Sequence, residues 1–260
     1  MRGRAIGAAA LVGAIFLASA GQAHAGVGGD TDTFFVDTTS DSGALTTCSP
    51  VTPADCSLRG AFVSADDGDP DTATDSIIFD ATIFDGNEAV PGEATVVMAG
   101  AGVSTDENLN LQALCSDIHP CAAIDGPPAD IAIRSQAGTL SMRGVAIFDT
   151  GLTGLQHSNG AEGLTLTNNW FGLRLDGTVD GNDVGVYLAG PNADVGVTGQ
   201  PANVFAGNRL GLQMVGLDAK DINVQSNLFG VKSDGSTVAA NTGTDIDISG
   251  NMANQAPSEV

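Results

Sequence analysis

Three aspartates stand close together in a glycine-rich stretch of this 260-residue chain, and acid–base chemistry is the first role to consider for them. They are Asp176, Asp180 and Asp183, and Arg174 and Arg209 flank them. Two carboxyl groups, or a carboxylate beside a basic side chain, are what the cleavage of a polysaccharide requires. The stretch is therefore a candidate active site until another role accounts for its acids.

A second copy of the same stretch argues against catalysis. Residues 168–178 read NNWFGLRLDGT and residues 226–236 read SNLFGVKSDGS, so five of eleven positions are identical. The second copy keeps Asp234-Gly235, but the other acids of the first loop are replaced there by Val238, Ala239 and Ala240. Because tight turns favour an Asp-Gly pair, we interpret these aspartates as turn residues. The sequence assigns no catalytic residue.

Residues that could hold a polysaccharide are sparse. The basic residues beyond position 25 are scattered along the chain: Arg59, Arg134, Arg143, Arg174, Arg209, Lys220 and Lys232. Trp170 and Tyr187 are the candidates for stacking on a sugar ring. Phe171 and Phe229 occupy matching positions in the two copies, which predicts that both point into the core.

Calcium is the metal that the sequence leaves open. Asp67, Asp69 and Asp71 alternate in a turn with glycine and proline, and carboxylate oxygens at such spacing can bind calcium. A solvated acidic loop is the simpler interpretation. Residues 176–181 begin like an EF-hand loop, but Tyr187 stands where that loop needs glutamate. We predict no cofactor and no metal ligand.

Four cysteines, Cys48, Cys56, Cys115 and Cys121, allow three disulfide connectivities. The short separations favour Cys48–Cys56 and Cys115–Cys121, each closing a local loop. Zinc binding by Cys115, His119 and Cys121 is the alternative, but it lacks a CxxC pair and a second histidine at ligand spacing. The isolated His119 and His157 are interpreted as structural.

The first 25 residues are typical of an export signal. Arg2 and Arg4 precede an uncharged, mostly apolar run over residues 5–20, and residues 23–25 (AHA) form a small-x-small cleavage site. We expect the mature chain to begin near Gly26 and to be secreted, either extracellular or at the cell surface, with a retained N-terminal anchor as the alternative. We expect no membrane span after the signal is removed.

The charge of the chain excludes one class of partner. The signal contains two of the nine basic residues and none of the 31 acidic ones, so a net charge of −22 becomes −24 in the mature chain. Nucleic acids and anionic lipids need cationic partners. We therefore expect no nucleic-acid partner.

Many short β-type runs separated by Gly, Asn and Asp follow residue 76, and they predict stacked coils. The two copies lie 58 residues apart, a period that suits two or three coils of a solenoid. Asparagine recurs at strand ends, at Asn169, Asn208, Asn227 and Asn251, where its amide can bond an identical amide one rung away. Ser57 is a plausible N-cap for a short helix whose apolar face is Leu58, Ala61, Phe62 and Ala65.

The predicted fold class is all-β: a right-handed parallel β-helix with a small N-terminal cap that contains one short helix. The predicted boundaries are a signal over 1–25, the cap over 26–75, the coils over 76–252 and a polar tail over 253–260.

A family resemblance agrees with this fold. Residues 56–62 (CSLRGAF) and 75–80 (DSIIFD) resemble the CSLREA N-terminal region of bacterial secreted and surface proteins, with Gly60 where that family has glutamate. Residues 123–127, 140–145 and 197–208, and the two N-x-F-G-x-x-x-D-G copies, resemble pectin-lyase-like β-helix repeats. The resemblance implies an exported β-helix and does not imply a reaction.

Two functions follow as hypotheses. The first is a non-enzymatic exported scaffold whose partners are extracellular glycans or other cell-surface components. The second is a polysaccharide lyase or glycoside hydrolase of the same fold. Two or three acids and one arginine or lysine converging on one face of the coils would favour the enzyme, and their dispersal would favour the scaffold.

Overall fold

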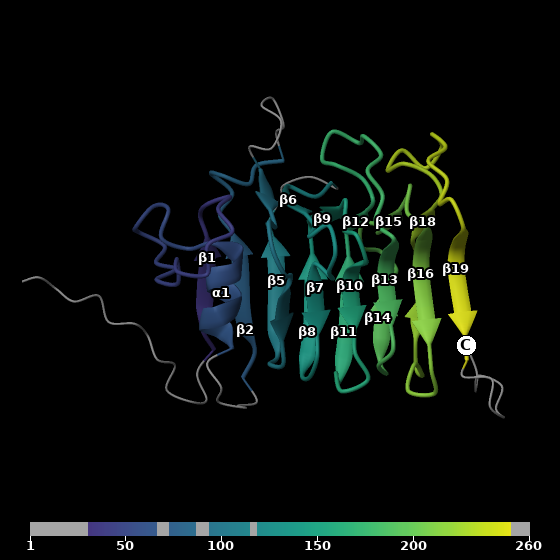
Figure 1. The fold of residues 1–260 in the computed structure, drawn as a ribbon, viewed down its shortest axis with the longest axis horizontal. Helices are drawn as coiled ribbons and strands as arrows, with labels where there is room; N and C mark the ends of the chain where they lie inside the picture. The colour runs from purple at the N-terminus through teal and green to yellow at the C-terminus, as the bar shows by residue number, and fades with distance from the viewer. Residues whose placement is uncertain (1–30, 67–72, 87–93, 115–118, 251–260) are drawn as a thin grey trace, which may run out of the picture.

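The structure is a computed structural model that describes residues 31–66, 73–86, 94–114 and 119–250. From β2 onward the strands follow a fixed cycle of three, one strand for each of three sheets. The pairings within the sheets are parallel. The chain is therefore a right-handed parallel β-helix, as the repeats predict, and its coils lie side by side in Figure 1.

Each sheet collects one strand from each coil. Sheet 1 consists of β1 (Thr33–Val36), β2 (Asp75–Phe79), β5 (Leu109–Ala113), β8 (Thr139–Arg143), β11 (Gly163–Thr167), β14 (Ala193–Val195) and β17 (Asn223–Val224). Sheet 2 consists of β3 (Thr95–Val97), β6 (Ala122–Asp125), β9 (Val145–Phe148), β12 (Trp170–Phe171), β15 (Val204–Phe205) and β18 (Leu228–Phe229). Sheet 3 consists of β4 (Val103–Thr105), β7 (Ile133–Ser135), β10 (Thr153–His157), β13 (Val184–Leu188), β16 (Leu210–Val215) and β19 (Thr244–Ser249). Among the described helices, none is long and apolar enough to cross a membrane.

A short helix covers the first coils. α1 (Leu58–Ala65) begins at Ser57, whose Oγ accepts a hydrogen bond from the backbone N–H of Gly60 at 2.8 Å. The predicted N-cap is confirmed, and the predicted apolar face, Leu58, Ala61, Phe62 and Ala65, is buried. The helix thus shields the apolar interior at this end of the solenoid.

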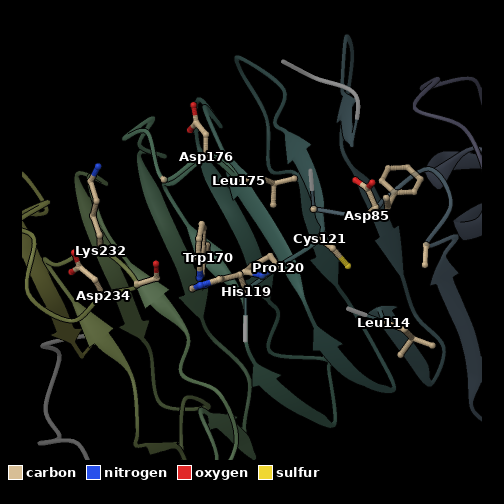
Figure 2. Close-up of a pocket in the computed structure, with 15 residues that line it drawn as sticks. Asp85, Leu114, His119, Pro120, Cys121, Trp170, Leu175, Asp176, Lys232 and Asp234 are labelled. Carbon is tan, nitrogen blue, oxygen red and sulfur yellow. The ribbon is translucent and has the colours of Figure 1, made fainter. Parts of the chain in front are cut away.

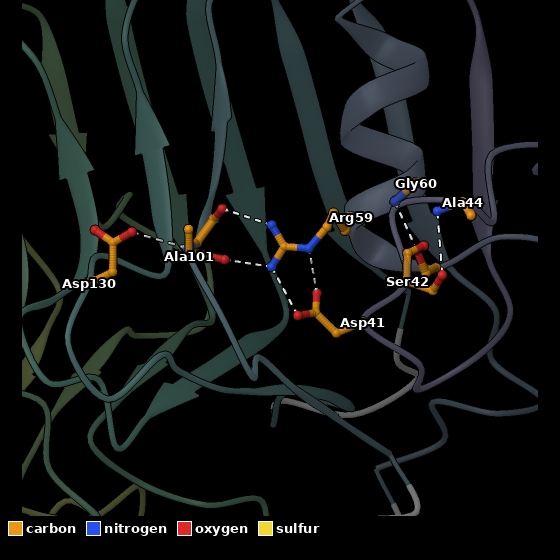
Figure 3. A network of polar contacts seen from close by, with 9 residues as sticks. Asp41, Ser42, Ala44, Arg59, Gly60, Ala101 and Asp130 are labelled. Carbon is orange, nitrogen blue, oxygen red and sulfur yellow. Dashed lines mark hydrogen bonds and ion pairs between the residues drawn. The ribbon is translucent and has the colours of Figure 1, made fainter.

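Arg59 joins this helix to the first coil. Its guanidinium makes a bidentate pair with Asp41, 2.9 Å for both contacts, and also donates to the carbonyl oxygens of Ala101 at 2.5 Å and Gly102 at 3.0 Å (Figure 3). Such planar, charge-assisted contacts are among the stronger hydrogen bonds in proteins. The next residue, Gly60, packs directly against the backbone: a Cβ atom there would lie 1.8 Å from the carbonyl oxygen of Leu45. This close approach leaves no room for a side chain at position 60.

One predicted disulfide lies within the described residues and is confirmed. Cys48 and Cys56 are bonded, with Cα atoms 4.3 Å apart. Cys121 is also disulfide-bonded, and Cys115, the partner predicted for it, lies outside the described residues.

Stacked phenylalanines connect the two sequence copies through the core. The rings of Phe171 and Phe205 lie 5.1 Å apart, and those of Phe205 and Phe229 lie 4.7 Å apart, nearly parallel in both pairs. The 58-residue period is therefore two coils, and the inward orientation predicted for Phe171 and Phe229 is confirmed. Phe171 and Phe205 are fully buried, whereas Phe229 in the last coil is half-buried.

Two asparagine ladders run along the corners of sheet 2. Asn169, Asn203 and Asn227 bond side chain to side chain over distances of 3.2 and 2.9 Å. Asn182, Asn208 and Asn241 do so at the next corner over distances of 3.0 and 3.2 Å. The equivalence of Asn169 and Asn227 is confirmed, Asn208 belongs to the second ladder, and Asn251 lies outside the described residues. The left-handed backbone falls on the preceding residues, Asn168 at φ 57° and Ser226 at φ 55°.

Sheet 3 holds a histidine inside the solenoid. His157 is fully buried, pairs in register with Ser135, and contacts the carbonyl oxygen of Pro191 through Nε2 at 2.8 Å. A carbonyl oxygen can only accept, so Nε2 carries the proton and, in the neutral ring, Nδ1 is an acceptor. Nδ1 has no hydrogen-bond partner among the described residues. Desolvation lowers the pKa of His157, with the Pro191 contact opposing the shift. The structural interpretation of this histidine accords with its burial.

We expect His157 to make the fold acid-sensitive. Below about pH 6.5 the unfolded chain binds a proton on this imidazole that the folded chain does not, so the free energy of unfolding falls as the pH drops from there. Urea unfolding at about pH 7.5 and pH 5.5 should show this loss in the wild type and a smaller loss in His157→Leu. The exposed His119→Gln is the matched control and should keep the wild-type difference. An unchanged difference in His157→Leu would contradict the prediction.

Candidate functional site

The outer face of sheet 2 is apolar and covered, unlike the outer face expected for a simple solenoid. One residue from each coil after the first forms its outward row: Ala123, Ala146, Trp170, Val204 and Leu228. The first four of these are buried and belong to a second hydrophobic cluster outside the coils, together with Phe148 and Leu173. Burial of this apolar row requires other parts of the chain to pack over it, and two loops do so.

The loops are small hairpins formed by the two sequence copies. A bridge pairs Leu173 with Val179 in the first hairpin, and another pairs Val231 with Val238 in the second. Each hairpin follows a strand of sheet 2, β12 or β18, and these strands are two coils apart. The repeated motif thus builds both the core phenylalanine and the outer hairpin that follows it.

The repeated aspartates fold the hairpin tips. Asp176 Oδ1 accepts from the backbone N–H of Thr178 at 2.7 Å, and Asp234 Oδ1 accepts from the N–H groups of Ser236 and Thr237 at 2.8 and 2.7 Å. The hydrogen bond from Thr178 lowers the pKa of Asp176, and the Thr237 hydroxyl does so for Asp234. The turn interpretation of these two residues is confirmed.

The other candidate acids are held in separate ion pairs. Arg174 donates to one carboxylate oxygen of Asp180, from Nε at 2.8 Å and from the terminal nitrogen at 2.5 Å. Arg209 forms a bidentate pair with Asp183, and this pairing lowers the pKa of Asp183. The structure therefore divides Asp176, Asp180 and Asp183 among three structural roles.

Two further acids, which the sequence pattern does not single out, lie near the first of these pairs. Asp125 is the last residue of β6 and Asp149 is the first residue after β9, so they lie at the ends of adjacent strands, near Arg174 and Asp180. Burial raises the pKa of Asp125, and repulsion from Asp149 and Asp180 adds to the rise against the attraction of Arg174. The Arg174 guanidinium also lies 4.5 Å from the centre of the Phe148 ring. Asp125, Asp149 and Asp180 thus converge around Arg174. These residues come from different coils, so the cluster forms only when the coils stack.

A groove of about 590 Å³ runs along the covered face of sheet 2. Figure 2 shows Asp85 and Leu114 at one end, Lys232 and Asp234 at the other, and Trp170 and His119 between them. Its remaining lining residues are Ala81, Phe84, Gly86, Pro120, Cys121, Leu175, Asp176, Gly177 and Ser233. The groove therefore extends from loops of the first two coils to the hairpin of the last one.

The predicted sugar-stacking residues are not brought together. Trp170 is 4% exposed, and the exposed His119 packs edge-on against its ring with 5.3 Å between ring centres. Trp170 therefore gives the groove a floor and does not offer a free ring face. Tyr187 is half-buried and lies in sheet 3, in register between Gln156 and Gln213.

The residues predicted as alternatives for metal binding lie in two separate parts of the chain. The acidic turn with Asp67, Asp69 and Asp71 lies outside the described residues. Among the described residues, carboxylate oxygens of Asp66, Asp106 and Glu107 lie within 4.8 Å of one another. Cys121 is disulfide-bonded, which removes its thiolate from the zinc alternative.

The fold and the groove define an all-β solenoid with a covered outer face and a surface groove. Comparison with known proteins found no matching family model, no matching curated protein and no matching solved structure.

Proposed function

We propose that this chain is an exported β-helix scaffold that binds extracellular glycans in the groove over sheet 2. The observation that carries the proposal is the groove itself. Its volume lies within the range of ligand-binding sites, and its lining joins an apolar floor to a few charged and polar side chains. Pyranose rings have the matching surface, since apolar C–H faces alternate with hydroxyl groups.

The proposal includes the CSLREA-like and pectin-lyase-like relationship and the export that it implies. The N-cap Ser57, the Arg59 contacts and the parallel pairing of β1 with β2 support it, because they give the CSLRGAF and DSIIFD segments a shared structural role. The signal-like residues 1–25 support export. Secretion, or display at the cell surface, would bring the groove to glycans.

Filling the groove should weaken glycan binding. Leu175 is half-buried in the groove lining, so Leu175→Trp places a large ring where a ligand would lie. We expect at least about a tenfold loss of affinity on a panel of soluble glucans, amino-sugar oligomers, pectins and alginate, measured by isothermal titration. Thr165→Trp, on the outer face of sheet 1, is the matched control and should bind like the wild type. Unchanged binding by Leu175→Trp would contradict the proposal, as would the absence of binding to the whole panel.

A polysaccharide hydrolase is the second candidate, and the convergence of Asp125, Asp149 and Asp180 around Arg174 favours it. A carboxyl group with a raised pKa, as Asp125 has, suits a general acid. The counterargument is that Arg174 and Asp180 already neutralise each other. We expect no new reducing ends and no unsaturated products from polygalacturonate, with or without calcium. Turnover that disappears in Asp125→Asn would establish the hydrolase instead.

A further inference from the structure

Carboxylates dominate the charge of the groove. Asp85, Asp176 and Asp234 line it, together with one lysine, Lys232. Lys232 attracts Asp176 and helps to lower its pKa, after the larger effect of the Thr178 N–H. The hydrogen bonds at Asp176 and Asp234 therefore favour the ionised carboxylates, and three carboxylates face one lysine in the groove.

The position of two of these acids is fixed by the fold. Asp176 and Asp234 are held by backbone N–H groups at the tips of equivalent hairpins. The hairpins follow strands two coils apart, so they recur roughly 9–10 Å apart along the solenoid. In a β-1,4-linked pyranose chain, equivalent side groups return to the same side of the chain at every second ring. The distance between such groups is similar to the distance between the two hairpins. A chain lying along the groove could present one group to each aspartate.

The charge of the whole chain acts in the same direction. A net charge of −24 after removal of the signal attracts cationic ligands and repels uronate polymers. Below the middle of the groove, the strands β9, β12 and β15 are paired with neighbouring strands on both sides. They offer an extended peptide no free strand edge with which to pair, while the apolar floor still suits sugar rings.

We propose that the ligand of this groove is an oligosaccharide of amino sugars, with protonated amines beside Asp176 and Asp234. This inference rests on the proposed function and names the glycan class for the same groove. It also sets the chain apart from polyuronate binding, because uronate carboxylates would meet carboxylates of the protein.

Isothermal titration at about pH 6 and low salt tests the inference with four hexasaccharides. They are the hexamers of glucosamine, of N-acetylglucosamine and of galacturonate, and cellohexaose, the neutral glucose hexamer. We expect the glucosamine hexamer to bind about tenfold more tightly than cellohexaose, as two exposed charge pairs would allow, and the galacturonate hexamer not to bind. The double variant Asp176→Asn/Asp234→Asn replaces each carboxylate by an amide, whose oxygen can still accept from the N–H groups of the turn, and it should bind the two oligomers equally. Asp194→Asn, on the outer face of sheet 1, removes one charge elsewhere and should keep the preference.

The failures of the two proposals can be distinguished. If the wild type binds the glucosamine hexamer and cellohexaose equally, the amino-sugar inference is overturned. If Leu175→Trp then loses this binding, glycan binding in the groove still stands. Displacement of the glucosamine hexamer by oligolysine of equal charge at equal concentration would also overturn it, in favour of basic peptides. No binding to any of the four would contradict both proposals.

Discussion

Phe205→Ala should lower the free energy of unfolding by about 3–5 kcal/mol, the range for truncating a fully buried aromatic ring. Phe205 is fully buried and stacks between Phe171 and Phe229, so the substitution opens a cavity between two neighbouring coils. In a solenoid each coil contacts only its neighbours, and a defect between coils cannot be repaired from elsewhere.

Chemical denaturation followed by circular dichroism measures the loss, with the denaturant slope compared among variants to check that the whole solenoid unfolds together. Phe229→Ala is the matched comparison and should lose less, because that ring is half-buried and has a stacking partner on one face. Losses of equal size for the two variants would show that the last coil is as tightly packed as the interior.

Asn208→Ala should destabilise the fold by a similar amount, about 3 kcal/mol or more. The Asn208 side chain accepts from the backbone and side-chain nitrogens of Asn182, both at 3.0 Å, and donates to the carbonyl oxygen of Phe171 at 2.9 Å and to Asn241 at 3.2 Å. Alanine leaves these buried groups unpaired, and each such group costs about 1–3 kcal/mol.

The same denaturation experiment tests the asparagine prediction. Asn227→Ala is the control, since Asn227 ends its ladder in a partly exposed coil where water can replace the lost contacts. A loss below about 1 kcal/mol for Asn208→Ala would mean that water also reaches the interior ladder, which contradicts its complete burial.

The repeating parts of the fold were predictable because their causes are local. Ser57 precedes an amphipathic run, and Phe171 and Phe229 recur with the same glycine and aspartate offsets, so the cap helix, the inward rings and the turn aspartates follow from spacing. The 58-residue period left two or three coils open. The stack of Phe171, Phe205 and Phe229 resolves this as two coils of unequal length.

The groove and the acidic cluster were not predictable, because they form only when distant loops meet. Asp125, Asp149 and Arg174 come from three coils, and no spacing along the chain indicates that they converge. Trp170 was a candidate for sugar stacking because of its residue type, but on the outer face of sheet 2 it is only 4% exposed. Leu173 and the rest of its hairpin cover that face, which depends on loop length and not on strand pattern.

The burial of Trp170 has a practical consequence for spectroscopy. It is the single tryptophan of the chain, so all indole emission reports from the floor of the groove. Its ring touches His119, which is exposed and lines the same groove. A ligand that moves this imidazole, or displaces water above it, would change the intensity or wavelength of that emission. The protein thus contains its own fluorescent probe for occupancy of the groove, and no label has to be attached.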